Sequence, residues 1–407
     1  MKSFSSIQTD SRHEPSSHGL RKFKSESMSG DGERIGKDTL HPNFLLISAL
    51  DYRTPRKANL HFIADELVKR GTTRFFSLRY SMLSRYKADP RTCIDERANR
   101  KEIFNGAECF LWKTLIHPFN TRKKMLRPLE NIFFNRYQSN PSAVLVEWME
   151  EADVIFFESG SAPIFFDQAC RINPNAKKVY IASDDLDTIN VADYVRKCFE
   201  RAAPNMTALC LPSRVLSPGM PETLNKYFVP HGIDHAIAAQ ADPSPYADGQ
   251  HAVSVGSMLF DPSFFQIASR LFPDITFHII GSGHVNQNYA ENVRVYDEMK
   301  YMDTLRYIKH ADFGIAPYRS EAVPAYLADT SMKLMQYDFF GLPAVCPEPA
   351  VGSHLHRFGY QPGNTGSIEA AICAALSAPH TSSARHLSWA EVADRLLEPQ
   401  HFDDTRI

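Results

Sequence analysis

The residue of this chain best placed for chemistry is a lysine near the start of an apparent helix. The stretch 331–343 puts Lys333 in the first turn of an amphipathic helix, with Thr330 and Ser331 available as caps. The free amides of a helix N-terminus, backed by a cation, form a site for a diphosphate. The helix ends at a Gly-x-Pro turn that leads into a short apolar run. A lone lysine at a helix start is more often a solvated surface residue. The turn and the apolar run favour the functional interpretation here, which is a site for the leaving nucleotide of a nucleotide-sugar.

Two further side chains are expected to accompany this lysine. Gln336 and Tyr337 follow Lys333 by three and four residues, and this spacing places them on or near its face of the helix.

A group of aspartates follows an apolar run in the first half of the chain. Asp184, Asp185 and Asp187 come directly after the run 178–182, and carboxylates at the carboxyl end of a parallel strand face the ligand cleft. One of them could deprotonate an acceptor hydroxyl. Two alternatives remain open. The spacing of Asp185 and Asp187 also matches a metal-binding motif of sugar transferases, although two Rossmann-like halves argue against it. The acids could also cap a helix and occupy its first turn.

Two turns of small residues lie at predicted strand ends in the second half. Gly256 and Ser257 let a ligand approach the backbone, and Met258 could pack on a base or ribose. The run 281–283 is Gly-Ser-Gly, but it does not complete G-x-G-x-x-G because position 286 is Asn. The structural alternative for Met258 is an ordinary core residue, and the alternative for the run 281–283 is an ordinary strand-to-loop turn.

The elements that must position these residues are short apolar strands alternating with helical patterns. This alternation predicts an α/β protein built from doubly wound parallel sheets, in two similar halves that face a cleft. Residues 1–40 are rich in Ser, Lys, Gly and Asp and are predicted to be a disordered tail. The predicted strands are 43–48, 75–78, 152–157, 178–182, 252–255, 275–280, 292–296, 313–318 and 344–346.

Composition is that of an ordinary soluble protein long enough for two domains. Of the 407 residues 43% are hydrophobic and 23% charged, and no apolar run approaches the length of a transmembrane helix. The N-terminus lacks the apolar middle region of a signal peptide. The seven cysteines form no C-x-x-C pair, which indicates reduced thiols in a cytoplasm rather than disulfides or a zinc site.

Charge is divided unevenly along the chain. Residues 41–230 carry 27 Lys and Arg against 21 Asp and Glu, whereas residues 231–407 carry 11 against 20. The basic half is expected to meet an anionic partner, unless this moderate excess of positive charge is unremarkable.

Two acid-free stretches, 74–87 and 119–127, interleave cations with aromatic and apolar residues. Such stretches suit an anionic membrane surface, with single-stranded nucleic acid or a core with solvated cations as alternatives. The absence of a nucleic-acid module favours the membrane.

These features resemble the GumK-like, xanthan-type β-glucuronosyltransferases of glycosyltransferase family 70. The likeness covers about residues 43–400. The stretches that carry it are 51–56, 71–80, 117–122, 182–184, 188–192, 255–262, 307–311 and 331–346.

The resemblance implies a GT-B fold with a deep cleft between two Rossmann-like domains. Residues 41–229 would form an acceptor and membrane-binding domain and residues 230–382 a nucleotide-sugar donor domain, with a helix at about 383–407 crossing back to the first. The family moves glucuronate from UDP-glucuronate to a polyprenyl-diphosphate-linked oligosaccharide in exopolysaccharide synthesis. Its members are peripheral, monotopic proteins on the cytoplasmic face of the bacterial inner membrane. No metal, other cofactor or nucleic acid is expected.

The resemblance also implies the roles of individual residues in an inverting transfer. The general base falls on Asp184. The donor contacts fall on Met258, Glu298, Tyr318, Ser331, Met332, Lys333 and Gln336. Two alternatives of other classes remain, namely a UDP-sugar epimerase of the same fold and a non-catalytic membrane adaptor.

Overall fold

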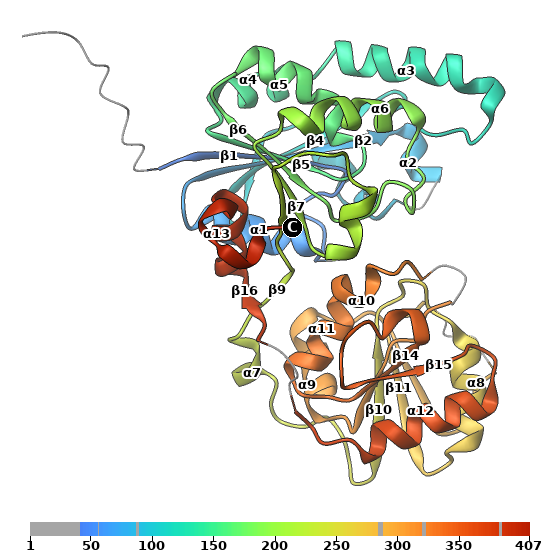
Figure 1. The fold of residues 1–407 in the computed structure, drawn as a ribbon. Helices are drawn as coiled ribbons and strands as arrows, with labels where there is room; N and C mark the ends of the chain where they lie inside the picture. The colour runs from blue at the N-terminus through green and yellow to red at the C-terminus, as the bar shows by residue number, and fades with distance from the viewer. Residues whose placement is uncertain (1–40, 56, 87–88, 284–287, 320–322, 382–384) are drawn as a thin grey trace, which may run out of the picture. The chain divides into compact units, whose positions relative to one another are not determined.

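The computed structural model describes residues 41–407 except 56, 87–88, 284–287, 320–322 and 382–384. The tail predicted for residues 1–40 lies outside the described residues. Within the described part, two parallel sheets carry helices on their faces (Figure 1).

The first sheet has the strand order β3-β4-β2-β1-β5-β6-β7-β8, and all its pairings are parallel except that of β3 with β4. Its strands are β1 Asn43–Ser48, β2 Thr72–Ser81, β3 Glu102–Phe104, β4 Ala107–Thr114, β5 Val154–Glu158, β6 Lys177–Ile181, β7 Ala208–Leu211 and β8 Lys226–Phe228. Its helices are α1 Asn59–Val68, α2 Met82–Tyr86, α3 Arg127–Ser139, α4 Ala143–Glu151, α5 Phe166–Ile172 and α6 Asp193–Ala202.

Strand β1 explains why the first sheet is covered on both faces. Leu45 and Ile47 belong to one apolar cluster, whereas Phe44 and Leu46 belong to another. Because successive side chains of a strand point to opposite faces, an unbroken apolar run requires a core on each side.

The second sheet has the strand order β12-β11-β10-β13-β14-β15, and all five pairings between these strands are parallel. Its strands are β10 Gln250–Val255, β11 Ile275–Ile280, β12 Val293–Tyr296, β13 Phe313–Ile315, β14 Ala344–Pro347 and β15 Arg357–Tyr360. Its helices are α7 Ile237–Gln240, α8 Pro262–Leu271, α9 Tyr301–His310, α10 Leu327–Thr330, α11 Met332–Phe339 and α12 Thr365–Ser377. The prediction of doubly wound α/β architecture is therefore confirmed.

The connections between the two sheets run side by side. The short strands β9 (Gly232–Ile233) and β16 (Leu387–Ser388) pair in parallel, so the chain leaves the first sheet and returns to it at neighbouring points. A Cβ on Gly232 would lie 3.0 Å from the Trp389 backbone, so a glycine allows this close approach. Helix α13 (Trp389–Leu397) then packs against α1, and the rings of Phe62 and Trp389 stack at 5.0 Å.

One of the two basic-aromatic stretches belongs to the core of the first half. Phe75, Phe76 and Leu78 are fully buried in β2, and Arg74 forms ion pairs with two glutamates. For this part of the stretch 74–87, the prediction of a membrane surface is wrong, because β2 is covered on both faces. Lys87 lies outside the described residues.

Candidate active site

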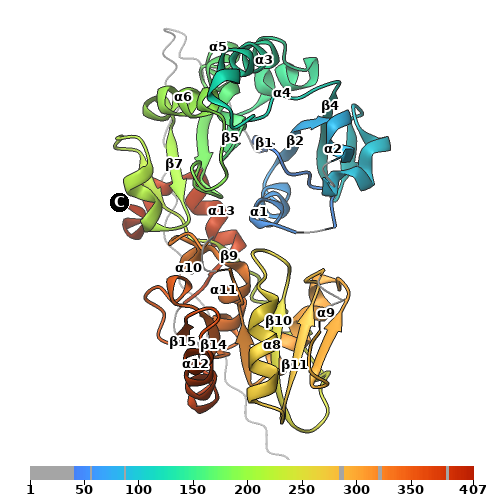
Figure 2. The same ribbon diagram turned by 90° about the vertical axis from the view of Figure 1, so that its right-hand side faces the viewer.

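A cavity of about 520 Å³ brings together residues from the carboxyl ends of both sheets. Asp184, which follows β6, lines it from the first half, and Lys333, in the first turn of α11, lines it from the second. The carboxyl ends of parallel strands are the usual ligand position in open α/β sheets. Figure 2 shows α11 and α10 at the end of the second sheet that faces the first half.

Asp184 lies half-buried at the wall of this cavity. Its backbone N–H donates to Ser159 Oγ at 3.0 Å, and Tyr326 Oη lies 3.5 Å from its carboxylate Oδ1. Burial raises the pKa of Asp184 to about 6, and the Tyr326 hydroxyl opposes that shift. A carboxylate with a pKa near neutrality is suited to take a proton from a hydroxyl.

A second carboxyl group, that of Glu158, lies beside Asp184 and also lines the cavity. Glu158 ends β5, is buried, and accepts hydrogen bonds from the hydroxyls of Ser48 and Ser183. Burial raises its pKa to about 7, and the two hydroxyls oppose the shift. Sequence reasoning missed Glu158, although an acid that closes the apolar run Val-Ile-Phe-Phe was a usable signal.

Lys333 presents an unpaired ammonium to the cavity. Ser331 caps α11, since its hydroxyl accepts from Leu334 N–H at 3.2 Å. The Lys333 Nζ is buried without a hydrogen-bond partner among the described residues and lies 5.3 Å from the centroid of the Tyr318 ring. Burial lowers the pKa of Lys333 to about 7. A cation that is desolvated but unpaired indicates a site for an anionic ligand.

The other donor residues implied by the resemblance gather around this lysine. The Tyr318 hydroxyl is 2.6 Å from Ser331 Oγ, and Gln336 Nε2 donates to Tyr301 Oη at 3.4 Å. The residues of this group that line the cavity are Met258, Tyr318, Ser331, Met332, Lys333 and Gln336.

Tyr337 does not share the cavity with its neighbours on α11. Its ring is fully buried, and its hydroxyl donates to the carbonyls of Val253 and Ile315, both at 3.2 Å. The expectation that it lies near the face of Lys333 is wrong, because this side of α11 packs on the second sheet.

Glu298 lines an adjoining cavity of about 470 Å³. Gly281 and Met299 line the same space, and Gly281 has a φ of +65°. A Cβ on Gly281 would lie 3.5 Å from Glu298 Cα, which is ordinary van der Waals contact, so this turn packs beside the loop that follows β12. The two cavities share several lining residues, namely Lys57, Val255, Gly256, Ser257, Tyr301, Thr304, Met332 and Gln336.

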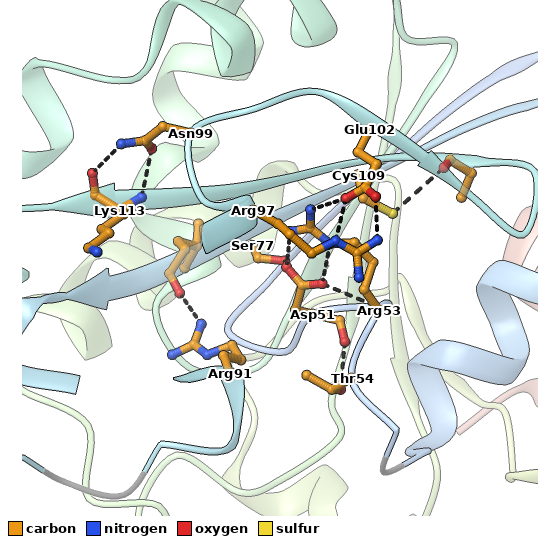
Figure 3. Close-up of polar contacts among 12 residues, drawn as sticks. Asp51, Arg53, Thr54, Ser77, Arg91, Arg97, Asn99, Glu102, Cys109 and Lys113 are labelled. Carbon is orange, nitrogen blue, oxygen red and sulfur yellow. Dashed lines mark hydrogen bonds and ion pairs between the residues drawn. The ribbon is translucent and has the colours of Figure 1, made fainter. Parts of the chain in front are cut away.

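Lys57 brings a second cation to both cavities from the first half. The loop before it is held by a buried network in which Arg53 pairs with Asp51 at 2.8 Å and with Glu102 at 3.1 Å (Figure 3). Ser77 Oγ also donates to the Asp51 carboxylate at 2.8 Å. Asp51 and Arg53 therefore support the site by fixing the loop that follows β1.

Asp185 and Asp187 do not line the cavity. Asp185 accepts hydrogen bonds from the backbone and hydroxyl of Thr188, and Asp187 forms an ion pair with Arg196. Among the described residues, no group of three His, Cys, Asp or Glu side chains is arranged to hold a metal ion. Asp185 and Asp187 therefore stabilise the local structure after β6, and Asp184 is the one aspartate of the three that lines the cavity.

Comparison with known proteins finds similarity to glucuronosyltransferases. Residues 46–212 match the family model for the N-terminal domain of the glucuronosyltransferase GumK. A UDP-glucuronate:glycolipid 2-beta-glucuronosyltransferase of Xanthomonas campestris pv. campestris is 54% identical over 367 residues, which cover 90% of this chain and 92% of that protein.

Solved structures of low sequence identity share the fold. A UDP-forming α,α-trehalose-phosphate synthase from Burkholderia xenovorans superposes with a TM-score of 0.57 at 10% identity, covering 88% of this chain and 100% of its own. The kitacinnamycin glycotransferase gives 0.51 at 13% identity, covering 88% and 99%. These likenesses confirm the predicted GT-B fold.

Proposed function

This chain belongs to the GumK family of glucuronosyltransferases, and we propose that it transfers glucuronate from UDP-glucuronate to a hydroxyl of a glycolipid. The observation that carries the proposal is that a single cavity is lined by the Asp184 carboxylate and by the Lys333 ammonium, which has no hydrogen-bond partner in the described part of the chain. The Xanthomonas relative is a UDP-glucuronate:glycolipid 2-beta-glucuronosyltransferase, which supports the choice of donor and of a glycolipid acceptor.

In this proposal the two sheets supply different parts of the chemistry. Asp184 takes the proton of the acceptor hydroxyl as that oxygen attacks the anomeric carbon. Lys333 and the N-terminal amides of α11 stabilise the negative charge that develops on the departing UDP. Because UDP-glucuronate carries its sugar in the α configuration, one displacement from the opposite face gives a β bond.

The acceptor that we propose is a polyprenyl-diphosphate-linked oligosaccharide of exopolysaccharide synthesis. A lipid-linked acceptor requires the protein to work at a membrane, and we propose a peripheral, monotopic position on the cytoplasmic face of the bacterial inner membrane. No helix in the described ranges has both the length and the apolar character needed to cross a bilayer.

Helix α3 and the segment before it supply the surface for this attachment. Met125 is 92% exposed and Ile132 64%, and Lys123 and Lys124 are exposed beside them. Figures 1 and 2 both show α3 at the outer edge of the first half. Exposed apolar side chains flanked by cations suit an anionic lipid surface.

Removing two of these cations is expected to weaken membrane binding. Each basic residue near an anionic surface contributes about 1 kcal/mol, so Lys123→Ala combined with Lys124→Ala should lower partitioning onto anionic vesicles by about 30-fold. Co-sedimentation with vesicles containing phosphatidylglycerol measures the change. Leu224→Glu, at a position 99% exposed elsewhere, is the matched control and should bind as the unaltered protein does. Equal partitioning of the double variant would exclude this surface.

The transfer itself is tested with membrane extract as the source of acceptor. Radiolabelled UDP-glucuronate should give a lipid-extractable product whose mass exceeds that of the acceptor by one glucuronate. An epimerase would convert the donor without extract, and an adaptor would not bind UDP in calorimetry. Either result would overturn the proposal.

A further inference from the structure

Arg79 lines the cavity from the first half, and its backbone adopts a conformation that L residues rarely accept. Its φ is +59°, in the left-handed region. The register between β2 and β4 shifts between Ser77 and Tyr80, so the irregularity is built into the strand. For a non-glycine residue this conformation is strained, and it persists only where the surroundings enforce it. Strain of this kind clusters at ligand sites.

Several contacts enforce that conformation. Arg91 donates to the carbonyl of Leu78 at 2.7 Å and to the carbonyl of Arg79 at 3.1 Å, and Figure 3 shows Arg91 reaching β2. The Tyr137 hydroxyl accepts from the Arg79 N–H at 3.2 Å. Asp89 in turn pairs with Arg91 at 2.7 Å. The structure therefore holds the Arg79 backbone at three neighbouring points.

Among the residues that the structure describes, no hydrogen bond or ion pair of the Arg79 guanidinium accounts for the support given to its backbone. Its Nε is buried without a hydrogen bond, and none of the described carboxylates pairs with it. Burial and the neighbouring Arg91 lower the pKa of Arg79. Arg74, five residues earlier on the same strand, shows the ordinary arrangement, since it pairs with Glu108 and Glu151. A desolvated arginine without an acid is expected to bind an anionic ligand.

We propose that Arg79 binds an anionic oxygen group of a substrate within the cavity. Two such groups enter under the proposed function, on which this inference rests. One is the carboxylate of the transferred glucuronate, and the other is the diphosphate of the lipid acceptor. Both are planar or tetrahedral oxyanions that a guanidinium binds through paired N–H donors.

Arg79→Asn separates a binding role from a structural one. Asparagine accepts the left-handed region better than arginine, so the melting temperature should stay equal or rise. Loss of a charge-assisted hydrogen bond should nevertheless lower kcat/KM by about 10- to 100-fold. Arg79→Lys should recover part of that loss. Arg201→Ala, which removes an exposed cation on α6, should keep full activity.

Kinetics with two different donors, and with the acceptor concentration varied, identify which of the two anions Arg79 binds. If Arg79 binds the sugar carboxylate, the Asn variant loses its preference for UDP-glucuronate over UDP-glucose, and the KM for the acceptor is unchanged. If it binds the diphosphate, the KM for the acceptor rises with either donor. Unchanged kinetics of the Asn variant, or a fall in melting temperature that accounts for the lost activity, would overturn the inference. Absence of product from the unaltered protein would instead overturn the proposed function.

Discussion

Replacing Asp184 by asparagine is expected to lower the transfer rate by about 100- to 10,000-fold, the usual contribution of a positioned general base. The affinity for UDP should change little, because Asp184 lines the cavity from the first half, whereas α11 belongs to the second. Single-turnover transfer and UDP calorimetry on the same preparation measure the two quantities. Asp185→Asn is the matched control, since this neighbour bonds Thr188 and does not line the cavity. Full activity of the Asp184 variant would remove it from the role of base.

The pH dependence follows from the same residue. With the pKa of Asp184 at about 6, kcat/KM should fall about tenfold per pH unit below that value, because the base is then protonated. The effect on folding stability has the opposite pH dependence: stability decreases, whereas activity increases, as the pH rises. Folding raises this pKa above its unfolded value, so the group favours the folded state below about pH 4 and loses that contribution as pH rises through 6. Asp184→Asn should therefore raise the melting temperature at neutral pH.

Replacing Lys333 by methionine is expected to weaken UDP binding by about 2–5 kcal/mol, the range measured when one partner of a buried charge pair is truncated. This corresponds to about 30- to 4,000-fold in affinity. The same change removes a buried, unpaired ammonium, so the free protein should melt at a higher temperature at pH 7. Calorimetry and a thermal melt measure the two effects. Lys300→Met, at the start of α9, serves as the control and should leave UDP affinity intact.

Protonation of Lys333 offers a direct signature of its role. Its pKa lies at about 7 in the free protein, and a bound diphosphate favours the ammonium form. At pH 8, UDP binding should therefore take up close to one proton, which calorimetry in two buffers of different ionisation enthalpy detects. The Met variant should show no uptake. Binding without proton uptake in the unaltered protein would place the diphosphate away from Lys333.

Local sequence patterns were sufficient to predict side chains that lie at the carboxyl end of a strand or at the start of a helix. The apolar runs predicted most of the parallel strands, because buried strands admit few other residues, but they did not predict β4, β7 or β15. The group Asp184, Asp185 and Asp187 was singled out because it follows an apolar run, and Lys333 because it stands at a helix start. The family resemblance then selected Asp184 from the three acids. In both cases the neighbouring residues alone indicate which end of the sheet the side chain occupies.

Features that depend on distant partners were not predictable in this way. Tyr337 follows Lys333 by one turn, but whether it faces ligand or sheet depends on how α11 packs on β10 and β13. Arg79 lies in an otherwise ordinary strand pattern, and its unusual backbone arises from Arg91 and from a register shift against β4. The hydrogen bonds that satisfy the buried Glu158 carboxylate come from Ser48 and Ser183, which are 110 and 25 residues away in sequence.

The pairing of β9 with β16 has a consequence for engineering this protein. Because the exit and the return of the chain are adjacent, the whole second half is an insertion in the first, joined at two points in register. The corresponding half of a relative can then be grafted as a single segment between these strands, with α13 left packed on α1. Cutting the chain once near residue 230 would instead strip α1 of its covering helix and expose Phe62 and its apolar neighbours.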